Sequence, residues 1–473
     1  MDDINFKPNL IKVGLFRIIA LSLAIIFAFN VLLVLKPNEY ANFILIFSFI
    51  QIISISILSW PNQYLLNYGR KSLSKAGNLN TILTARIIVH IILFICLVII
   101  IIFLSPSFAK FFNLEIDVLK YSLIFGILTF PLVDIFTTYT QVYGKFFSYS
   151  ISPIVQRFFQ ILALILLYYN FYDDWTILIS FTIIGYFISF MFLFIEAPKN
   201  DLLNLKFCKN ELTNLFKYSS YIPISTISLL LFNWIDIWLI RFFFDEGSSG
   251  IFAWSYSFVL ITNGLFTSLS IVIAPKVIDF TNKKNLKDKN KYYYNIISIC
   301  LIFNLFLPLG LFLFNYILLN YLPYAFKDAR LIILILISSI GFQFIFTFLE
   351  PIAYAKKNIV KKYSKLLVKM LIFKLALILI FFVNFDFVYI SLATFLSYLY
   401  VVIKQSYLLN LKVISICKPC LGSIIIVNVF SVALIYFMIN ETNWFTYVMY
   451  FSYIILVLIL VKFRQLKFLP KLS

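Results

Sequence analysis

The feature that most constrains the fold is a series of long apolar segments separated by short polar connections. A membrane-spanning helix needs about 20 mostly apolar residues, because the hydrocarbon core is about 30 Å thick and each helical residue rises about 1.5 Å. This criterion predicts about fourteen transmembrane helices. The predicted segments are Leu10–Leu35, Ala41–Leu66, Thr81–Leu104, Val118–Val142, Ser150–Tyr169, Trp175–Ile195, Tyr218–Phe244, Ile251–Pro275, Tyr293–Leu319, Ala329–Ala355, Leu366–Val383, Val388–Leu411, Leu421–Ile439 and Trp444–Val461.

The composition indicates that lipid is the solvent for most of these residues. Hydrophobic residues make up 62% of the chain and charged residues 12%, whereas soluble domains carry about a quarter charged residues. Lipid offers no hydrogen-bond partners, so each spanning segment must satisfy its own backbone groups as a helix. We therefore expect an all-α polytopic membrane protein.

The basic residues are distributed very unevenly between alternate connections. All but six of the 39 Lys and Arg residues fall on one side of the predicted topology. The positive-inside rule places that side, with both termini, in the cytoplasm. The net charge of +19 is therefore mainly a topology signal that anionic lipid headgroups can neutralise, and does not indicate a nucleic-acid partner. The six on the other side are Lys36, Lys110, Lys120, Arg241, Lys327 and Arg330.

A longer cytoplasmic connection follows the sixth segment and suggests a division of the chain. We expect an N-terminal six-helix bundle over residues 1–195 and a connection over residues 196–217. A second six-helix bundle would cover residues 218–411, and two additional helices with a cytoplasmic tail would cover residues 412–473. Two similar bundles around a central cavity are typical of transporters.

Short loops and missing motifs argue against most enzymes. No connection is long enough for a soluble catalytic domain, and neither GxxxxGK[ST] nor a Gly-rich dinucleotide loop occurs. The chain has one His, which excludes a His-based metal site, and the lone CxxC of Cys417 and Cys420 is weak evidence for metal or redox chemistry. We expect no cofactor, no metal and no enzymatic activity.

Ionisable residues inside predicted spans are the first candidates for function, because a buried charge in a membrane is expensive. Asp134, Asp236 and Glu350 could bind a coupling proton or Na⁺, or pair with a buried base. Interhelical hydrogen bonding explains Asp134 and Asp236 equally well. Simple interfacial placement explains Glu350.

A second set of candidates is basic. Arg17, Arg86, Arg157 and Lys374 could grip a diphosphate from an inward-facing cavity, because guanidinium groups bind phosphate oxygens in a bidentate manner. Arg86 shares a helical face with His90, four residues on. The competing interpretation is that these chains snorkel to the cytoplasmic interface. Lys374 is predicted to lie too deep in the membrane for its ammonium group to reach the interface fully by snorkelling.

Polar side chains also recur at helical spacing in two segments. One stripe comprises Ser48, Gln51, Ser59 and Asn62, and the other comprises Asn263, Thr267 and Ser270. These residues could face a hydrated cavity or could join neighbouring helices by hydrogen bonds. The sequence leaves both interpretations open.

The seventh and eighth segments resemble a known family. Trp234-Ile-Asp-Ile-Trp-Leu-Ile, then Gly250-Ile-Phe-Ala-Trp-Ser-Tyr, then Ala274-Pro275-Lys276 is similar to the polysaccharide transporter branch of the multidrug/oligosaccharidyl-lipid/polysaccharide (MOP) exporter superfamily. Helix number, short loops and cytoplasmic termini extend the resemblance over the whole chain.

The resemblance implies a Wzx-type flippase of the bacterial inner membrane in O-antigen, lipopolysaccharide or capsular polysaccharide biosynthesis. Such a protein moves undecaprenyl-diphosphate-linked oligosaccharide across the membrane by alternating access. It works beside membrane lipids, polymerase and chain-length proteins. Related lipid II flippases also carry an Arg in the first helix, and Arg17 is a residue of the same type in the first predicted helix of this chain. The alternatives are a cation-coupled multidrug or metabolite exporter of the same superfamily and a membrane-embedded glycan polymerase.

Overall fold

The computed structural model describes residues 6–409 except residues 113, 173, 220–221, 262, 265–321, 356 and 385. Every regular element in this described part is helical. The helices before the largest gap are α1 (Phe6–Val34), α2 (Pro37–Ile53), α3 (Asn62–Ala76), α4 (Asn80–Phe112), α5 (Ile116–Val142), α6 (Phe146–Tyr168), α7 (Thr176–Glu196), α8 (Lys199–Leu203), α9 (Lys209–Ser219) and α10 (Ile222–Phe243), with the π-helical turn η1 (Ser54–Leu58) after α2. Residues 246–261 are also helical.

The helices after the gap are α13 (Ala329–Ser338), α14 (Ile340–Ala355), α15 (Lys357–Asn384) and α16 (Ile390–Leu408), with the short 3-10 turns η2 (Tyr324–Phe326) and η3 (Phe387–Tyr389). Eight helices in the described part are long and apolar enough to cross a membrane, or nine if the bent pair α13 and α14 forms one span. The all-α polytopic membrane architecture is confirmed. Predicted segments Tyr293–Leu319, Leu421–Ile439 and Trp444–Val461, the end of Ile251–Pro275 from residue 265 onward and the CxxC lie outside the described residues.

Two predicted spans are interrupted in the structure. The segment Ala41–Leu66 begins earlier, at Pro37, since proline suits the first turn of a helix, and it breaks after η1. Pro61 has no backbone N–H and cannot continue the helix, so α3 starts as a new element. The segment Ala329–Ala355 divides at Ser339 into α13 and α14.

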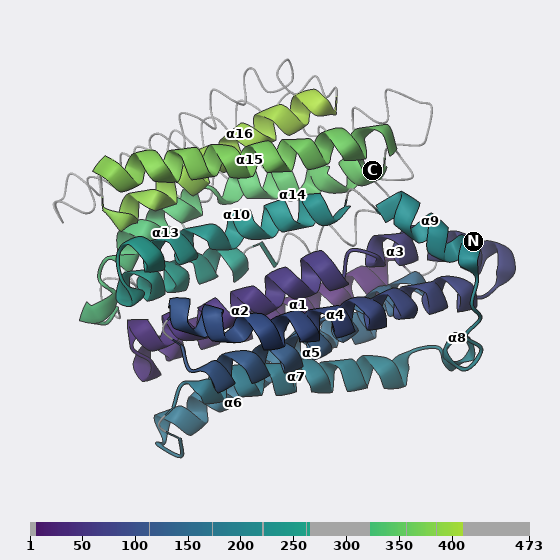
Figure 1. Cartoon of the computed structure of the whole chain (residues 1–473), viewed down its shortest axis with the longest axis horizontal. Helices are drawn as coiled ribbons and strands as arrows, with labels where there is room; N and C mark the ends of the chain where they lie inside the picture. The colour runs from purple at the N-terminus through teal and green to yellow at the C-terminus, as the bar shows by residue number, and fades with distance from the viewer. Residues whose placement is uncertain are drawn as a thin grey trace. The chain divides into compact units, whose positions relative to one another are not determined.

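The chain separates into two compact units. Unit 1 comprises residues 1–272 and 357–376, and unit 2 comprises residues 273–356 and 377–473. In unit 1, α6 packs against both α1 and α7, α5 packs against α4 and α7, and α2 packs against α5 and α10 (Figure 1). In unit 2, α16 packs against α13 and α14. The predicted division at residues 195, 218 and 411, with its central cavity, stays a prediction.

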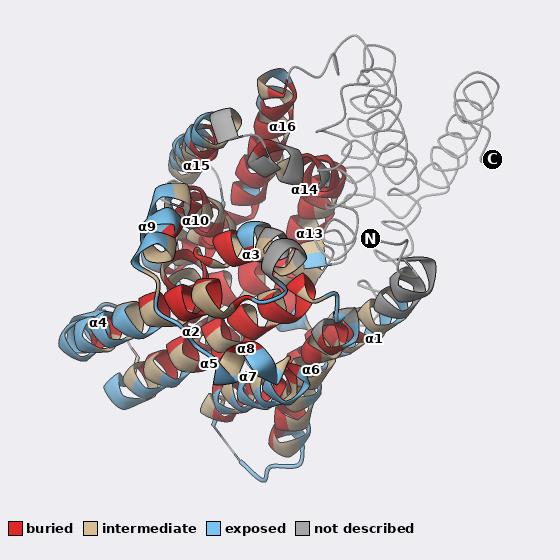
Figure 2. Cartoon of the chain, turned by 90° about the vertical axis from the view of Figure 1, so that its right-hand side faces the viewer, coloured by how far each residue is buried: buried red, intermediate tan, exposed pale blue. Residues whose placement is uncertain are grey.

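The outward side of α4 shows how unit 1 meets lipid. Ile91, Ile95, Ile99 and Phe103 are exposed large apolar side chains on this helix, and Figure 2 shows its outer surface coloured as exposed. An apolar surface of this size would be unfavourable in water and is expected of a helix that faces acyl chains. The opposite face of α4 carries Arg86 and His90, which are buried.

Gly250, a residue of the family-like motif, permits a close approach between two backbone segments in unit 1. A Cβ atom built on Gly250 would overlap the Pro37 carbonyl oxygen at the start of α2. The adjacent Trp254 side chain donates a 2.6 Å hydrogen bond from Nε1 to the Ala28 carbonyl of α1. The motif therefore fixes how residues 246–261 pack against the turn between α1 and α2.

We expect Gly250→Ala to destabilise unit 1 by about 1–3 kcal/mol, because the added methyl group forces two backbones apart. Thermal unfolding of the purified full chain in detergent measures the change. Gly14→Ala is the matched control, since nothing lies within 4 Å of a Cβ at Gly14. Equal unfolding temperatures for the two variants would contradict the packing role of Gly250.

Candidate functional site: buried charges in unit 1

Asp236 and Lys374 form a completely buried ion pair. Lys374 Nζ lies 2.7 Å from Asp236 Oδ2, and both side chains have 0% exposure. The ammonium group also donates to the Phe232 carbonyl and lies 4.2 Å from the centroid of the Phe232 ring. The pair joins α10 to α15 at a point where neither charge reaches water.

A second polar group surrounds Asp134 on α5. Ser59 Oγ donates a 2.8 Å hydrogen bond to Asp134 Oδ2 from the end of the α2 and η1 helix. Arg86 on α4 is within electrostatic range of Asp134, but no ion pair of 4.0 Å or less joins them in the described part of the chain. The carboxylate is thus held by one hydroxyl and balanced by a cation at longer range.

Arg86 caps the C-terminal end of the helix formed by α2 and η1. Its Nη2 donates to the Leu58 carbonyl at 2.6 Å, and its Nε donates to Asn62 Oδ1 at 2.7 Å. Carbonyl groups at the C-terminal end of a helix lack intrahelical partners and carry partial negative charge, so a cation is stabilised there. The break at Pro61 provides this acceptor for Arg86 inside unit 1.

His90 lies one turn further along α4 and is also buried. Its ring stacks on Phe94 with centroids 6.2 Å apart, and its Nδ1 has no hydrogen-bond partner in the described structure. Arg86 and His90 therefore face inward together, as their spacing predicted. The geometry shows no snorkelling of Arg86 to the interface.

Arg157 on α6 is a cation in a spanning helix that contacts a side-chain amide and an aromatic ring. Its Nη1 donates a 2.7 Å hydrogen bond to Gln160, whose Nε2 reaches Thr182 on α7 at 3.2 Å. Its guanidinium lies 5.9 Å from the Phe27 ring of α1. No carboxylate lies within 4.0 Å of it in the part of the chain that is described, and the side chain is only half-buried.

Arg17 lies on α1 and Arg157 on α6, at different levels along this pair of packed helices. Phe16 contacts Phe147 of α6 with ring centroids 5.3 Å apart, whereas Phe27 contacts Arg157. α1 and α6 thus run in the same direction, and ten residues on α6 correspond to about 15 Å. The structure places Arg17 and Arg157 on one seam of helices but does not bring them together. Glu350 lies in unit 2, half-buried on α14.

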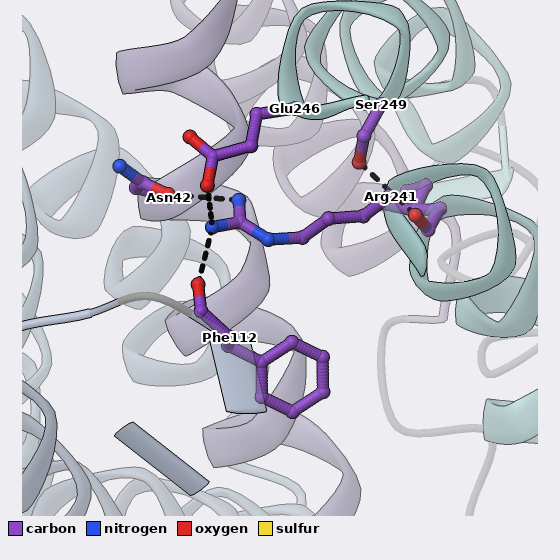
Figure 3. A network of polar contacts seen from close by, with 6 residues as sticks. Asn42, Phe112, Arg241, Glu246 and Ser249 are labelled. Atoms are coloured by element: carbon purple, nitrogen blue, oxygen red, sulfur yellow. Dashed lines mark hydrogen bonds and ion pairs between the residues drawn. The ribbon is translucent and has the colours of Figure 1, made fainter. Parts of the chain in front are cut away.

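Arg241 at the end of α10 forms a network that sequence reasoning missed. Its Nη1 donates to Asn42 Oδ1 of α2 at 2.8 Å, and its Nη2 donates to the Phe112 carbonyl at 2.6 Å and pairs with Glu246 at 2.7 Å (Figure 3). Phe112 is the last residue of α4, so this carbonyl is another helix C-terminal acceptor. One guanidinium therefore ties the ends of α2, α4 and α10 together.

The polar stripe on the second predicted segment serves interhelical contacts. Ser48 accepts a 2.9 Å hydrogen bond from Trp238 Nε1, Ser59 donates to Asp134, and Asn62 accepts from Arg86. The interpretation that these three residues join helices is therefore supported by direct contacts. Most of the other stripe, from Thr267 onward, lies outside the described residues.

Comparison with known proteins identifies the fold. Among solved structures, the lipid II flippase MurJ in an inward closed conformation aligns with a TM-score of 0.62 at 16% identity, over 97% of this chain and 99% of that chain. A MOP superfamily transporter from Pyrococcus furiosus aligns with a TM-score of 0.65 at 10% identity, over 86% and 96%. An outward-facing multidrug resistance MATE family transporter aligns with a TM-score of 0.62 at 14% identity, over 87% and 97%.

No protein-family model matches the chain, and no curated protein matches its sequence. At these low identities the structural likeness establishes the fold alone. The chain is a multi-pass membrane protein with the fold of MOP superfamily transporters, whose solved examples include both a lipid flippase and multidrug exporters.

Breaking the buried pair should be strongly destabilising. We expect Asp236→Asn or Lys374→Met alone to destabilise the chain by about 3–5 kcal/mol, because each leaves the other partner buried without its counter-charge. The double variant should lose clearly less than the sum of the single variants. Denaturant unfolding of all four proteins in one detergent measures the coupling, and strict additivity would show that the pair is absent in solution.

The Arg241 network predicts a local effect. Arg241→Lys keeps the charge but cannot donate to Asn42, Phe112 and Glu246 at once, so backbone amides around the start of α5 should exchange about tenfold faster. Hydrogen exchange read by mass spectrometry on the full chain measures this, with Lys369→Arg on the exposed face of α15 as control. Unchanged exchange near residues 114–118 would refute the role of Arg241.

Proposed function

We propose that this chain is a flippase that moves undecaprenyl-diphosphate-linked oligosaccharide repeat units across the bacterial cytoplasmic membrane by alternating access. The observation that carries the proposal is Arg157, a half-buried guanidinium in a spanning helix with no carboxylate within 4.0 Å in the described structure. An uncompensated cation inside a membrane suits an anionic substrate, and a guanidinium suits phosphate oxygens in particular. The fold shared with a lipid II flippase supports the same conclusion.

We divide the four proposed basic residues between two roles. Lys374 is neutralised by Asp236, and Arg86 is held by Leu58 and Asn62, so both stabilise the protein rather than grip the substrate. The diphosphate is instead assigned to the seam of α1 and α6. Arg17 would meet it near the cytoplasmic end, and Arg157 would meet it about 15 Å deeper. The lipid tail would remain in the bilayer throughout.

The acidic residues are proposed to bias the two states of the transport cycle. Asp134 is held by Ser59 and balanced by Arg86, so binding of a proton or Na⁺ there would change how α2, α4 and α5 interact. Asp236 would act through Lys374, and Glu350 would act from unit 2. A coupling ion can shift the equilibrium only if it binds the two states with different affinity.

The second candidate is a cation-coupled multidrug or metabolite exporter, which has the same fold in the MATE transporters. Asp134 and Asp236, both acids inside spans, favour it. Because Asp236 is already paired with Lys374, an exported cation would depend chiefly on Asp134. A glycan polymerase is the least favoured alternative, and association with polymerase and chain-length proteins belongs to the flippase proposal alone.

We expect Arg157→Ala to lower the flipping rate about tenfold or more, since hydrogen bonds to a charged group are worth about 1.5–3 kcal/mol. Arg157→Lys should be intermediate, because an ammonium group keeps the charge but loses the bidentate geometry. The assay uses the full chain in proteoliposomes with a fluorescent undecaprenyl-diphosphate-linked oligosaccharide. Lys369→Gln, which removes an exposed cation from α15, is the matched control.

Two outcomes would reject the flippase. Wild-type protein that moves cationic dyes against a proton or Na⁺ gradient, without moving the lipid-linked sugar, would establish the exporter. In a flippase-deleted strain, full restoration of surface glycan by both Arg17→Ala and Arg157→Ala would show that the diphosphate site is assigned wrongly.

A further inference from the structure

The connection between α7 and α10 has an inner face that is hydrogen-bonded to other segments of unit 1. Asp201 of α8 is 2% exposed and accepts hydrogen bonds from the Tyr139 and Tyr143 hydroxyls and from the Leu79 backbone N–H, the last at 3.1 Å. Burial, reinforced by the Asp201 carboxylate, raises the pKa of Tyr143 well above its ordinary value, so its hydroxyl remains a donor. Glu211 of α9 accepts a 2.6 Å hydrogen bond from Tyr64.

The other side of this connection is exposed and is apolar and basic. We call it the outer face. Its apolar members include Leu203, which is 80% exposed, and Phe207, which is 66% exposed. They project from α8 and from the extended residues 205–208, and Figure 2 shows α8 and α9 with exposed surfaces. The outer face comprises Leu203, Leu205, Phe207 and Phe216 with the exposed lysines Lys199, Lys206, Lys209 and Lys217.

The two faces separate charge by sign. Asp201 and Glu211 turn inward onto tyrosines, whereas the four lysines turn outward. Four large apolar side chains exposed to water would be unfavourable, and none of the four lysines lies within 4.0 Å of a carboxylate in the described structure. Apolar side chains interleaved with Lys are the pattern of a segment that lies in the interfacial plane of a membrane.

The position of the connection fits such a surface. It leaves the span α7 at Glu196 and enters the span α10 at Ile222, so both of its ends are fixed at the boundary of the bilayer. The locked inner face prevents it from extending away into water. Its outer face therefore remains within reach of lipid headgroups.

We propose that the outer face binds the interfacial region of the bilayer and selects anionic phospholipids. Leu203, Leu205, Phe207 and Phe216 enter the boundary between headgroups and acyl chains, and the four lysines contact lipid phosphates. Each lysine near an anionic surface strengthens binding about fivefold. The inference concerns lipids of the membrane itself and does not depend on which substrate the transporter moves.

The first experiment measures lipid selection with the full chain in nanodiscs that mix phosphatidylethanolamine and phosphatidylglycerol. Native mass spectrometry of protein released from the discs gives the enrichment of phosphatidylglycerol. The variant K199Q/K206Q/K209Q should lower this enrichment about fivefold or more. The control K110Q/K120Q/K327Q removes the same charge from connections predicted on the other side of the membrane. Equal enrichment in both variants would overturn the selection of anionic lipid by the outer face.

The second experiment measures how deeply the outer face lies in the bilayer. Bimane attached at L205C, in a full chain whose native cysteines are serine, should be quenched by phospholipids carrying a shallow doxyl group. N210C, an exposed position on α9 outside the outer face, supplies the reference. Quenching at L205C that matches N210C would place the outer face in water and overturn the proposal in favour of a protein partner. This readout needs no transport activity, so it remains valid if the flippase proposal fails.

Discussion

Charged groups inside the spans dominate this structure, because hydrocarbon supplies neither water nor counter-ions to neutralise them. A charge placed there is stabilised by a polar or charged partner within the protein. Lys374 finds Asp236, and Arg241 finds Glu246 together with a carbonyl of α4. Each pairing joins helices that hydrophobic packing alone would leave free to slide. The relative placement of α10, α15 and α2 in unit 1 follows from these pairings.

Helix ends inside unit 1 provide a second kind of partner for cations. Leu58 ends the helix formed by α2 and η1, and Phe112 ends α4, and each carbonyl accepts from an arginine. The partial negative charge of a helix C-terminus stabilises a guanidinium there, and the planar donor group can reach a side-chain acceptor at the same time. Asn62 and Asn42 are those second acceptors. The two sites use the same chemistry at different places along α2.

Hydropathy predicted the spans in the described part because bilayer thickness acts on each segment separately. The pairing of Asp236 with Lys374 could not be predicted in the same way, since they lie on helices distant in sequence and either could have had another partner. Arg241 was missed because an arginine in the last turn of a span has the pattern of an ordinary interfacial residue. Gly250 was recognised as part of a motif, but only the structure shows that the Pro37 carbonyl requires it. Local spacing was more informative for Arg86 and His90, which share a helical face and are both buried.

Arg157 differs from the other buried cations in a way that bears on transport. A guanidinium neutralised by a carboxylate gains little from an incoming phosphate, because the phosphate must compete with a partner that is already in place. In the described structure the Arg157 guanidinium contacts Gln160 and the Phe27 ring, so an arriving anion would add a charge interaction without displacing a carboxylate. Under the proposed function, an anionic headgroup would lower the energy of the state in which it contacts Arg157. Such a difference between the empty and loaded states is what a carrier needs if its substrate is to shift the conformational equilibrium.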